Sequence, residues 1–105
     1  MKVSANLGFL WSDLPLLDRI DAAARAGFMA VETHQPFEVA PNVLKARCRD
    51  AGVKLLGINT AKGSQPGDQG LAAVPGRETE ARALIKQAID YAHDAGATAV
   101  HVLAG

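Results

Sequence analysis

The sequence predicts a parallel α/β fold built from repeated strand–helix units. Three alanine–glycine pairs, at residues 26–27, 51–52 and 95–96, each follow a helix-like segment and precede a short apolar segment. A glycine just past a helix supplies the left-handed residue that caps the helix C-terminus. An apolar run of about four to eight residues, bounded by such a break, is typical of a buried strand. With one strand ahead of them, these repeats predict four strands alternating with three helices.

The four strands are expected to have two different faces, because side chains alternate along a strand. One face is uniformly aliphatic and is expected to pack against the helices. In the third strand this face should hold Leu56 and Ile58, with Leu55 on the opposite face. The strands are expected at residues 2–7, 29–34, 55–60 and 98–103.

Capping residues and prolines predict where the helices begin. Ser12 or Asp13 is expected to cap the first helix, with Pro15 in its first turn. The second helix is expected to start at Pro41, and the third near Arg77. All three are expected to end at the alanine–glycine pairs.

Polar side chains gather on the second face of the predicted strands. Asn6, Glu32, His34, Asn59 and His101 come from four different strands. A sheet covered by helices on both faces has no reason to collect polar groups on one of them. In a closed barrel one face lines the interior, which opens at the C-terminal ends of the strands, where barrel active sites lie. We therefore expect Asn6, His34 and Asn59 near the mouth of a barrel, with Glu32 and His101 deeper.

Each of these residues also has a structural interpretation. An inward asparagine or histidine is often a hydrogen-bonded structural residue, and this is favoured for Asn6 and His101 taken singly. Glu32 and His34 lie two residues apart on one face, and an inward carboxylate is costly without a partner. The pair could position a substrate hydroxyl, or Glu32 could orient the imidazole. Metal binding is the weaker alternative, because two residues do not complete a site.

Two connections follow strands on the expected functional side. Residues 61–76 form a loop far longer than the about 2–6 residues usual in α/β units. We predict that this loop is a lid; a mobile insertion without a function is the alternative. Residues 8–11 follow the first strand, and Phe9 or Trp11 could wall a pocket there; Trp11 is the substrate-binding candidate. Packing against the first helix is the alternative for this aromatic residue.

Composition limits the partners and the compartment. Eleven Lys and Arg residues balance eleven Asp and Glu residues, so no electrostatic field favours nucleic acid or a membrane surface. No segment has the length of a spanning helix, and none has the features of a secretory signal. The one cysteine, Cys48, is expected in the apolar stripe of the second helix, and a lone cysteine fits a reducing compartment. A cytoplasmic location is therefore expected.

Three motifs resemble the hydroxypyruvate isomerase family, a member of the xylose isomerase-like TIM barrels. They are Ser-Ala-Asn-Leu at residues 4–7, Ala-Gly-Phe at 26–28 leading to Val-Glu at 31–32, and Gly-Leu-Ala-Ala-Val-Pro-Gly-Arg-Glu at 70–78. The last is the most specific, and the resemblance runs over essentially the whole chain. It implies a (β/α)8 barrel, a fold of about 250 residues. Residues 1–105 are then expected to form one partial domain, the first half of the barrel, truncated before the fourth helix.

The resemblance also implies a reaction. Family members interconvert hydroxypyruvate and tartronate semialdehyde, or similar small hydroxy-oxo acids, by proton transfer through an enediol. Two carboxylates act as acid and base, and a divalent metal, Mg²⁺ or Mn²⁺, polarises the oxygens. In the family these groups come from strands five to eight. The resemblance therefore assigns no catalytic residue and no metal ligand to this chain, and it predicts that the chain alone is inactive.

What the resemblance matches is the substrate-facing half, at Asn6, Glu32, Asn59 and Arg77. The Arg77 guanidinium could grip a substrate carboxylate, and a surface arginine at a helix start is the alternative. The sequence departs from the family at residues 33–37, which read Thr-His-Gln-Pro-Phe, and it lacks the Gly-Asp-Trp segment of the lid. These departures leave the substrate open. The alternatives are a sugar or sugar-phosphate epimerase on the same scaffold, and a non-catalytic half-barrel that self-associates through open sheet edges.

Overall fold

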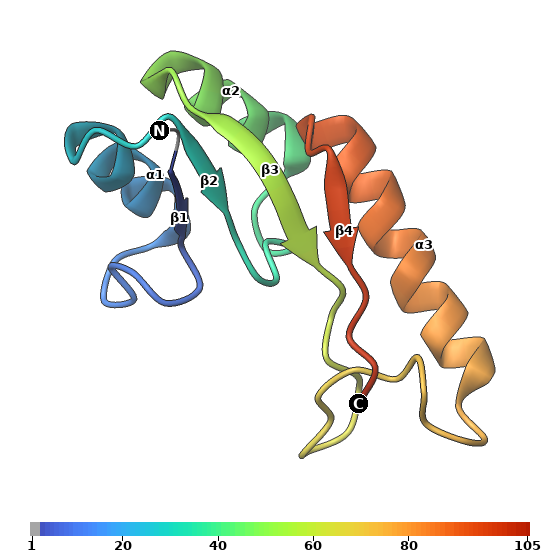
Figure 1. Ribbon diagram of the computed structural model, residues 1–105. Helices are drawn as coiled ribbons and strands as arrows, with labels where there is room; N and C mark the ends of the chain where they lie inside the picture. The colour runs from blue at the N-terminus through green and yellow to red at the C-terminus, as the bar shows by residue number, and fades with distance from the viewer. Residues whose placement is uncertain (1–2) are drawn as a thin grey trace.

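The computed structural model describes residues 3–105 and confirms the predicted alternation of strands and helices (Figure 1). The four strands pair in parallel in the order β1-β2-β3-β4, so each pairs with the next one in the chain. This is the arrangement of the first half of a (β/α)8 barrel. The elements are β1 (Ser4–Asn6), α1 (Leu16–Arg25), β2 (Ala30–Glu32), α2 (Pro41–Ala51), β3 (Lys54–Asn59), α3 (Glu78–Ala95) and β4 (Ala99–His101).

Three of the strands are shorter than predicted. β1, β2 and β4 have three residues each, and β3 begins one residue earlier than expected. The predicted start of the first strand, residue 2, lies outside the described residues. Pairing nevertheless continues beyond the end of β2, because the Thr33 N–H donates to the Gly57 carbonyl and the Asn59 N–H donates to the His34 carbonyl. The backbone of His34 is therefore held beside β3, although the residue lies in a loop.

A β-bulge interrupts the pairing of β2 with β3. Val31 pairs with Leu55, whereas Glu32 pairs with Gly57, so that Leu56 has no partner on β2. A bulge changes which face the following residues occupy. The prediction that Leu55 faces away from the helices is therefore wrong, because Leu55 is 5% exposed and lies in the core.

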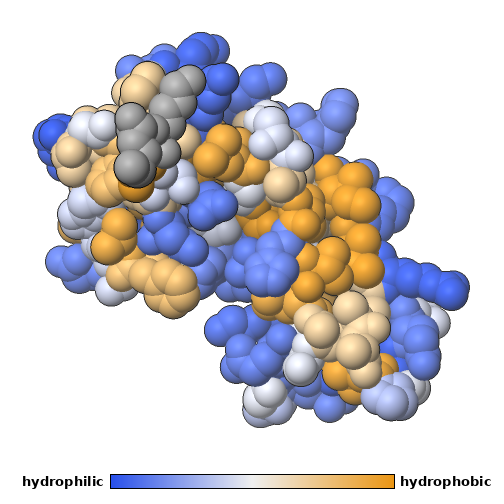
Figure 2. Space-filling view, viewed as in Figure 1, coloured by the Kyte–Doolittle hydropathy of each residue, from blue (hydrophilic) through white to orange (hydrophobic). Residues whose placement is uncertain are grey.

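All three helices lie on one face of the sheet, and within residues 3–105 the opposite face carries no helix (Figure 1). The helix-covered face holds the main hydrophobic core. Three of its largest fully buried side chains come from three different elements: Ile20 from α1, Leu44 from α2 and Ile58 from β3. Figure 2 shows the open face, where hydrophobic and hydrophilic surface lie side by side.

The ends of the helices agree with the sequence in part. The prediction that Ser12 or Asp13 caps α1 is wrong: the helix begins after Pro15 and has no side-chain cap. α2 begins at Pro41 as expected and ends at Ala51, where Gly52 caps it with a left-handed φ of 75°. No helix within residues 3–105 combines the length and hydrophobicity needed to cross a lipid bilayer.

Cys48 is a core residue, as predicted, and this has a measurable consequence. It is 4% exposed, and burial raises the pKa of its thiol from 9.0 to about 11. Only the thiolate is reactive. Raising the thiol pKa from 9.0 to about 11 lowers the thiolate fraction near pH 8 by about a hundredfold. We expect iodoacetamide to alkylate the native protein at least about a hundredfold more slowly than the urea-unfolded chain. Mass spectrometry of timed samples would measure both rates, and similar rates would contradict this assignment.

Candidate functional site

A cavity of about 450 Å³ lies on the open face of the sheet, at the C-terminal ends of the strands. Its polar lining comes from all four strands and the adjoining loops. This confirms that the polar residues identified from strand alternation converge on one place, while their role in binding a substrate stays a prediction. The polar residues around the cavity are Asn6, Glu32, Thr33, His34, Asn59 and His101.

The polar residues are arranged in two layers. Asn6 pairs with Glu32 in register, and Asn59 pairs with His101. The prediction that His101 lies deeper than Asn59 is therefore wrong, because the two residues are level. Asn6 and Glu32 are level in the same way, so Glu32 is not deeper than Asn6. The position of a residue within its own strand did not predict how deep it lies in the cavity, because neighbouring strands are offset along the sheet. The bulge adds one residue to β3 and shifts its register further.

Asn6 shapes the loop that follows β1. Its side-chain Oδ1 accepts a hydrogen bond from the Gly8 N–H at 2.9 Å, and its backbone carbonyl accepts bonds from the N–H groups of Phe9 and Leu10. Asparagine commonly stabilises turns in this way. The structural interpretation of Asn6 is thus supported, and its amide NH₂ remains available at the cavity.

Glu32, at the end of β2, and His34, in the loop that follows, both line the cavity. Glu32 is exposed and His34 is half-buried. In the described part of the chain, no group of three or more His, Cys, Asp or Glu residues is placed to hold a metal ion. These two side chains do not by themselves fit the divalent metal that the family resemblance implies, since such a site needs further ligands.

Phe9, and not Trp11, is the aromatic residue at the cavity. The Trp11 ring packs edge-to-face on Phe28, with ring centroids 6.3 Å apart, and it lies against the hydrophobic core. Phe9 is 74% exposed and lines the cavity, where its ring meets His34. The sequence showed that one of these residues could form a wall. The choice depends on the backbone turn, which includes a left-handed φ of 52° at Trp11.

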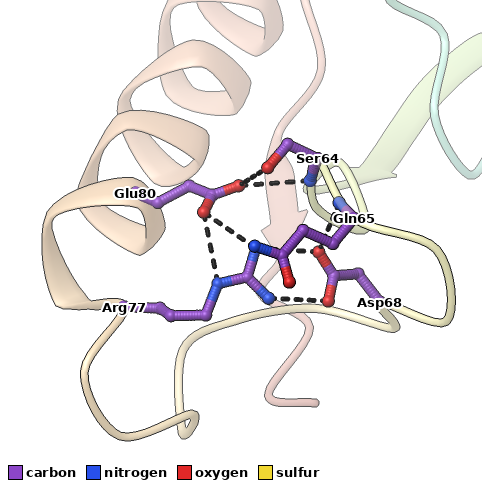
Figure 3. A network of polar contacts seen from close by, with 5 residues as sticks. All are labelled: Ser64, Gln65, Asp68, Arg77 and Glu80. Carbon is purple, nitrogen blue, oxygen red and sulfur yellow. Dashed lines mark hydrogen bonds and ion pairs between the residues drawn. The ribbon is translucent and has the colours of Figure 1, made fainter.

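Arg77 lies away from the cavity lining and holds the long loop to the start of α3. Its guanidinium donates to both oxygens of Asp68 at 2.7 and 2.8 Å, and to Glu80 at 2.8 Å (Figure 3). The Arg77 and Asp68 side chains are only 18% and 13% exposed. The structure therefore does not bring Arg77 together with the other predicted site residues, because the loop supplies its partners.

Further contacts order the 61–76 loop. Glu80 accepts hydrogen bonds from both the N–H and the hydroxyl of Ser64 (Figure 3). Gly70 forms an antiparallel bridge with Ala104, and Leu71 is 2% exposed. The loop is thus folded against α3 and the last residues of the chain. Its function as a lid stays a prediction.

We expect acid to loosen this loop. Hydrogen bonds from Arg77 and the Gln65 N–H lower the pKa of Asp68, and bonds from Ser64 and Arg77 lower that of Glu80. A carboxyl whose pKa is lowered by folding stabilises the fold above its unfolded pKa, here 3.8 and 4.5, and loses that effect as the pH falls. The ¹⁵N heteronuclear NOE of residues 63–69 should therefore be high at about pH 6 and fall below about pH 4.

Arg77→Gln is the matched variant for this pH experiment. It removes the charge and the bidentate bond, so its loop should give low NOE values already at about pH 6. Unchanged values in the unsubstituted chain at about pH 2.5 would contradict the assigned role of the Asp68 and Glu80 carboxylates.

Comparison with known proteins extends the resemblance seen in the motifs. The family model described as xylose isomerase-like TIM barrel matches residues 20–105. A human protein named "Putative hydroxypyruvate isomerase" is 41% identical over 107 residues, covering 100% of this chain and 39% of the relative. A Cupriavidus necator protein named "2-oxo-tetronate isomerase" is 41% identical over 105 residues, covering 99% of this chain and 40% of the relative.

A solved structure agrees with the fold. The chain matches a protein titled AP endonuclease, family 2, from Brucella melitensis with a TM-score of 0.91 and 30% identity, covering all of this chain and 42% of that one. The chain thus spans about two fifths of the length of the relatives it matches. The match over residues 20–105, with the four parallel strands, shows that the chain belongs to the xylose isomerase-like TIM barrel family.

Proposed function

We propose that this chain forms the substrate-binding half of an isomerase that acts on a small hydroxy-oxo acid such as hydroxypyruvate. One observation carries the proposal: polar side chains from four parallel strands converge on one cavity at the C-terminal end of the sheet. Sites in this class of barrel lie at that end. The names of the relatives, hydroxypyruvate isomerase and 2-oxo-tetronate isomerase, support the substrate class.

The side chains suit the parts of such an acid. The Glu32 carboxylate can accept a hydrogen bond from a substrate hydroxyl, and the Asn59 amide can donate one to an oxo or carboxylate oxygen. The His34 imidazole can donate or accept, depending on its tautomer. Together they would orient the substrate for proton transfer.

The groups that move the proton are proposed to lie outside this chain. An enediol mechanism needs an acid, a base and, in the resembled family, a divalent metal that stabilises the oxygens when bound. The described residues hold no cluster that fits this metal, so we derive no step through it. We therefore expect the 105-residue chain to show no isomerisation of hydroxypyruvate with added Mg²⁺ or Mn²⁺, and measurable turnover would overturn this part of the proposal.

Binding can be tested on the chain itself. Titration of the ¹⁵N-labelled protein with hydroxypyruvate should perturb the backbone amides of Glu32, Asn59 and His101. Each of Glu32→Gln and Asn59→Ala should weaken binding by about tenfold, since one good hydrogen bond to a charged ligand is worth about that much. Gln87→Ala, on the exposed side of α3, is the control and should bind normally.

Other outcomes of this titration would decide against the proposal. Absence of any perturbation at the cavity would contradict it. Perturbation by a sugar such as D-fructose, but not by hydroxypyruvate, would favour a sugar epimerase of the same family.

Self-association is a second candidate property, favoured by the edges of the sheet. β1 and β4 each pair on one side only within the described residues, and an open strand edge invites pairing with another chain. Val3 and Met29 also expose 54% and 62% of their surface. Two copies related by a twofold axis would bring β4 beside β1 and complete eight strands. Light scattering after size-exclusion chromatography should then show a dimer, and a monomer would exclude this arrangement.

A further inference from the structure

We propose that Gly8 and Phe9 are positioning residues that hold the His34 imidazole in the cavity, where it bonds an oxygen of the bound acid. The inference rests on the proposed function and adds a mechanism for placing one of its groups. It starts from the unequal way in which the parts of His34 are held. The His34 backbone is fixed to β3, because its carbonyl accepts the Asn59 N–H at 2.9 Å.

The imidazole ring, in contrast, is held by packing alone. Among the described residues, the histidine ring that forms a hydrogen bond is that of His93, which contacts Asp94 on the outside of α3. The His34 ring forms none there. The nitrogens of the His34 ring are therefore free to bond a ligand. His34 also lines two cavities, the one of about 450 Å³ and a second of about 560 Å³ that includes Pro15 and Gln35. A side chain next to such open space can occupy several rotamers unless something restrains it.

Phe9 restrains the ring from the side of the first cavity. The two rings meet edge-to-face, with centroids 4.9 Å apart and an angle of 88° between their planes. This is a preferred geometry for aromatic pairs. Phe9 is 74% exposed, so its ring contributes little to the core. Its contact with His34 is the feature that accounts for its position.

Gly8 restrains the ring through its backbone, which can contact the imidazole because glycine has no side chain. A methyl group at Gly8 would overlap the imidazole, so the backbone there packs directly on the ring. The φ of Gly8 is not among the left-handed values of the chain, so alanine is compatible with its backbone. The glycine is thus required for the close approach and not for the turn. The hydrogen bond from its N–H to Asn6 fixes its place.

Gly8→Ala is accordingly a tool that displaces the His34 ring without straining the backbone. In the unsubstituted chain, saturating hydroxypyruvate should shift the ¹⁵N and ¹H signals of the His34 ring, while the exposed His93 ring serves as an internal reference. Gly8→Ala and His34→Ala should each weaken hydroxypyruvate binding by about five- to tenfold. Leu10→Ala, in the same loop but outside the cavity lining, should bind normally.

A double substitution separates positioning from a general structural effect. If Gly8 acts through the imidazole, Gly8→Ala should have no further effect on binding in a His34→Ala background. Phe9→Ala should follow the same rule, with a smaller effect alone. Equal losses in both backgrounds would overturn the proposal.

The result also distinguishes this inference from the proposed function. If hydroxypyruvate perturbs the amides of Glu32 and Asn59 but leaves the His34 ring unchanged, the positioning role is overturned and the proposed function stands. If neither responds, both are overturned.

Discussion

Replacement of Leu44 by alanine is expected to lower the free energy of unfolding by about 3 kcal/mol. Leu44 is fully buried on the inner side of α2, in the core that joins the helices to the sheet. The substitution removes buried apolar surface and leaves a cavity that the packed neighbours fill only in part. Because a small domain has a total stability of about 5–15 kcal/mol, the loss should be large enough to shift the urea midpoint clearly.

The neighbouring residue provides the control for this experiment. Val43 lies on the same turn of α2 but is 43% exposed, so Val43→Ala should change the free energy of unfolding by less than about 0.5 kcal/mol. Far-UV circular dichroism during urea titration would measure both variants. Equal effects of the two substitutions would show that α2 does not pack on the sheet through Leu44.

Replacement of Arg19 by alanine is expected to release the loop that carries Gly8 and Phe9. The Arg19 guanidinium donates to three backbone carbonyls of that segment: Leu14 at 2.7 Å, Leu7 at 2.9 Å and Ser12 at 3.1 Å. Hydrogen bonds from a charged donor are among the stronger ones. We expect a loss of about 2 kcal/mol in unfolding free energy, with amide exchange in residues 9–14 at least about tenfold faster.

Two further variants define what Arg19 contributes. Arg25→Ala removes an exposed arginine from the last turn of the same helix and should cost less than about 0.5 kcal/mol. Arg19→Lys keeps the charge but not the planar set of donors, so it should restore only part of the protection. Full protection in Arg19→Ala would contradict the claim that this side chain organises the loop.

The order of elements could be predicted because its signals are local. A glycine in the left-handed region ends a helix whatever the tertiary context, and Gly52 and Gly96 do so at 75° and 80°. Strand alternation likewise placed Glu32, His34 and Asn59 on one side of the sheet, where the cavity lies. These features are determined by residues close to them in the sequence, so they can be predicted without knowing the tertiary structure.

The errors arose where a distant partner decides the outcome. The bulge that turns Leu55 into the core is a property of the pairing between β2 and β3, so no pattern within β3 alone predicts it. For Arg77 the sequence left two roles open, a grip on a substrate carboxylate and a surface arginine at a helix start; it could not show that Asp68, nine residues earlier, pairs with both arms of the guanidinium. That contact depends on the path of the whole loop.

Arg19 and Gly8 were missed for a related reason. An arginine in an amphipathic helix is usually a solvated residue, and nothing in its spacing shows that three carbonyls will surround it. Gly8 was expected only as part of a connection. Its importance depends on a ring that lies 26 residues later in the chain and packs on its backbone. Gly8 thus contacts the His34 ring, and Arg19 bonds the loop that carries Gly8.

A crystal structure of the chain with hydroxypyruvate tests the central claim most directly. Our account predicts electron density for the acid in the cavity between β2 and β4, with its oxygens within hydrogen-bonding distance of Glu32, His34 and Asn59. Density for the acid at another surface, with the cavity filled only by solvent, would contradict it.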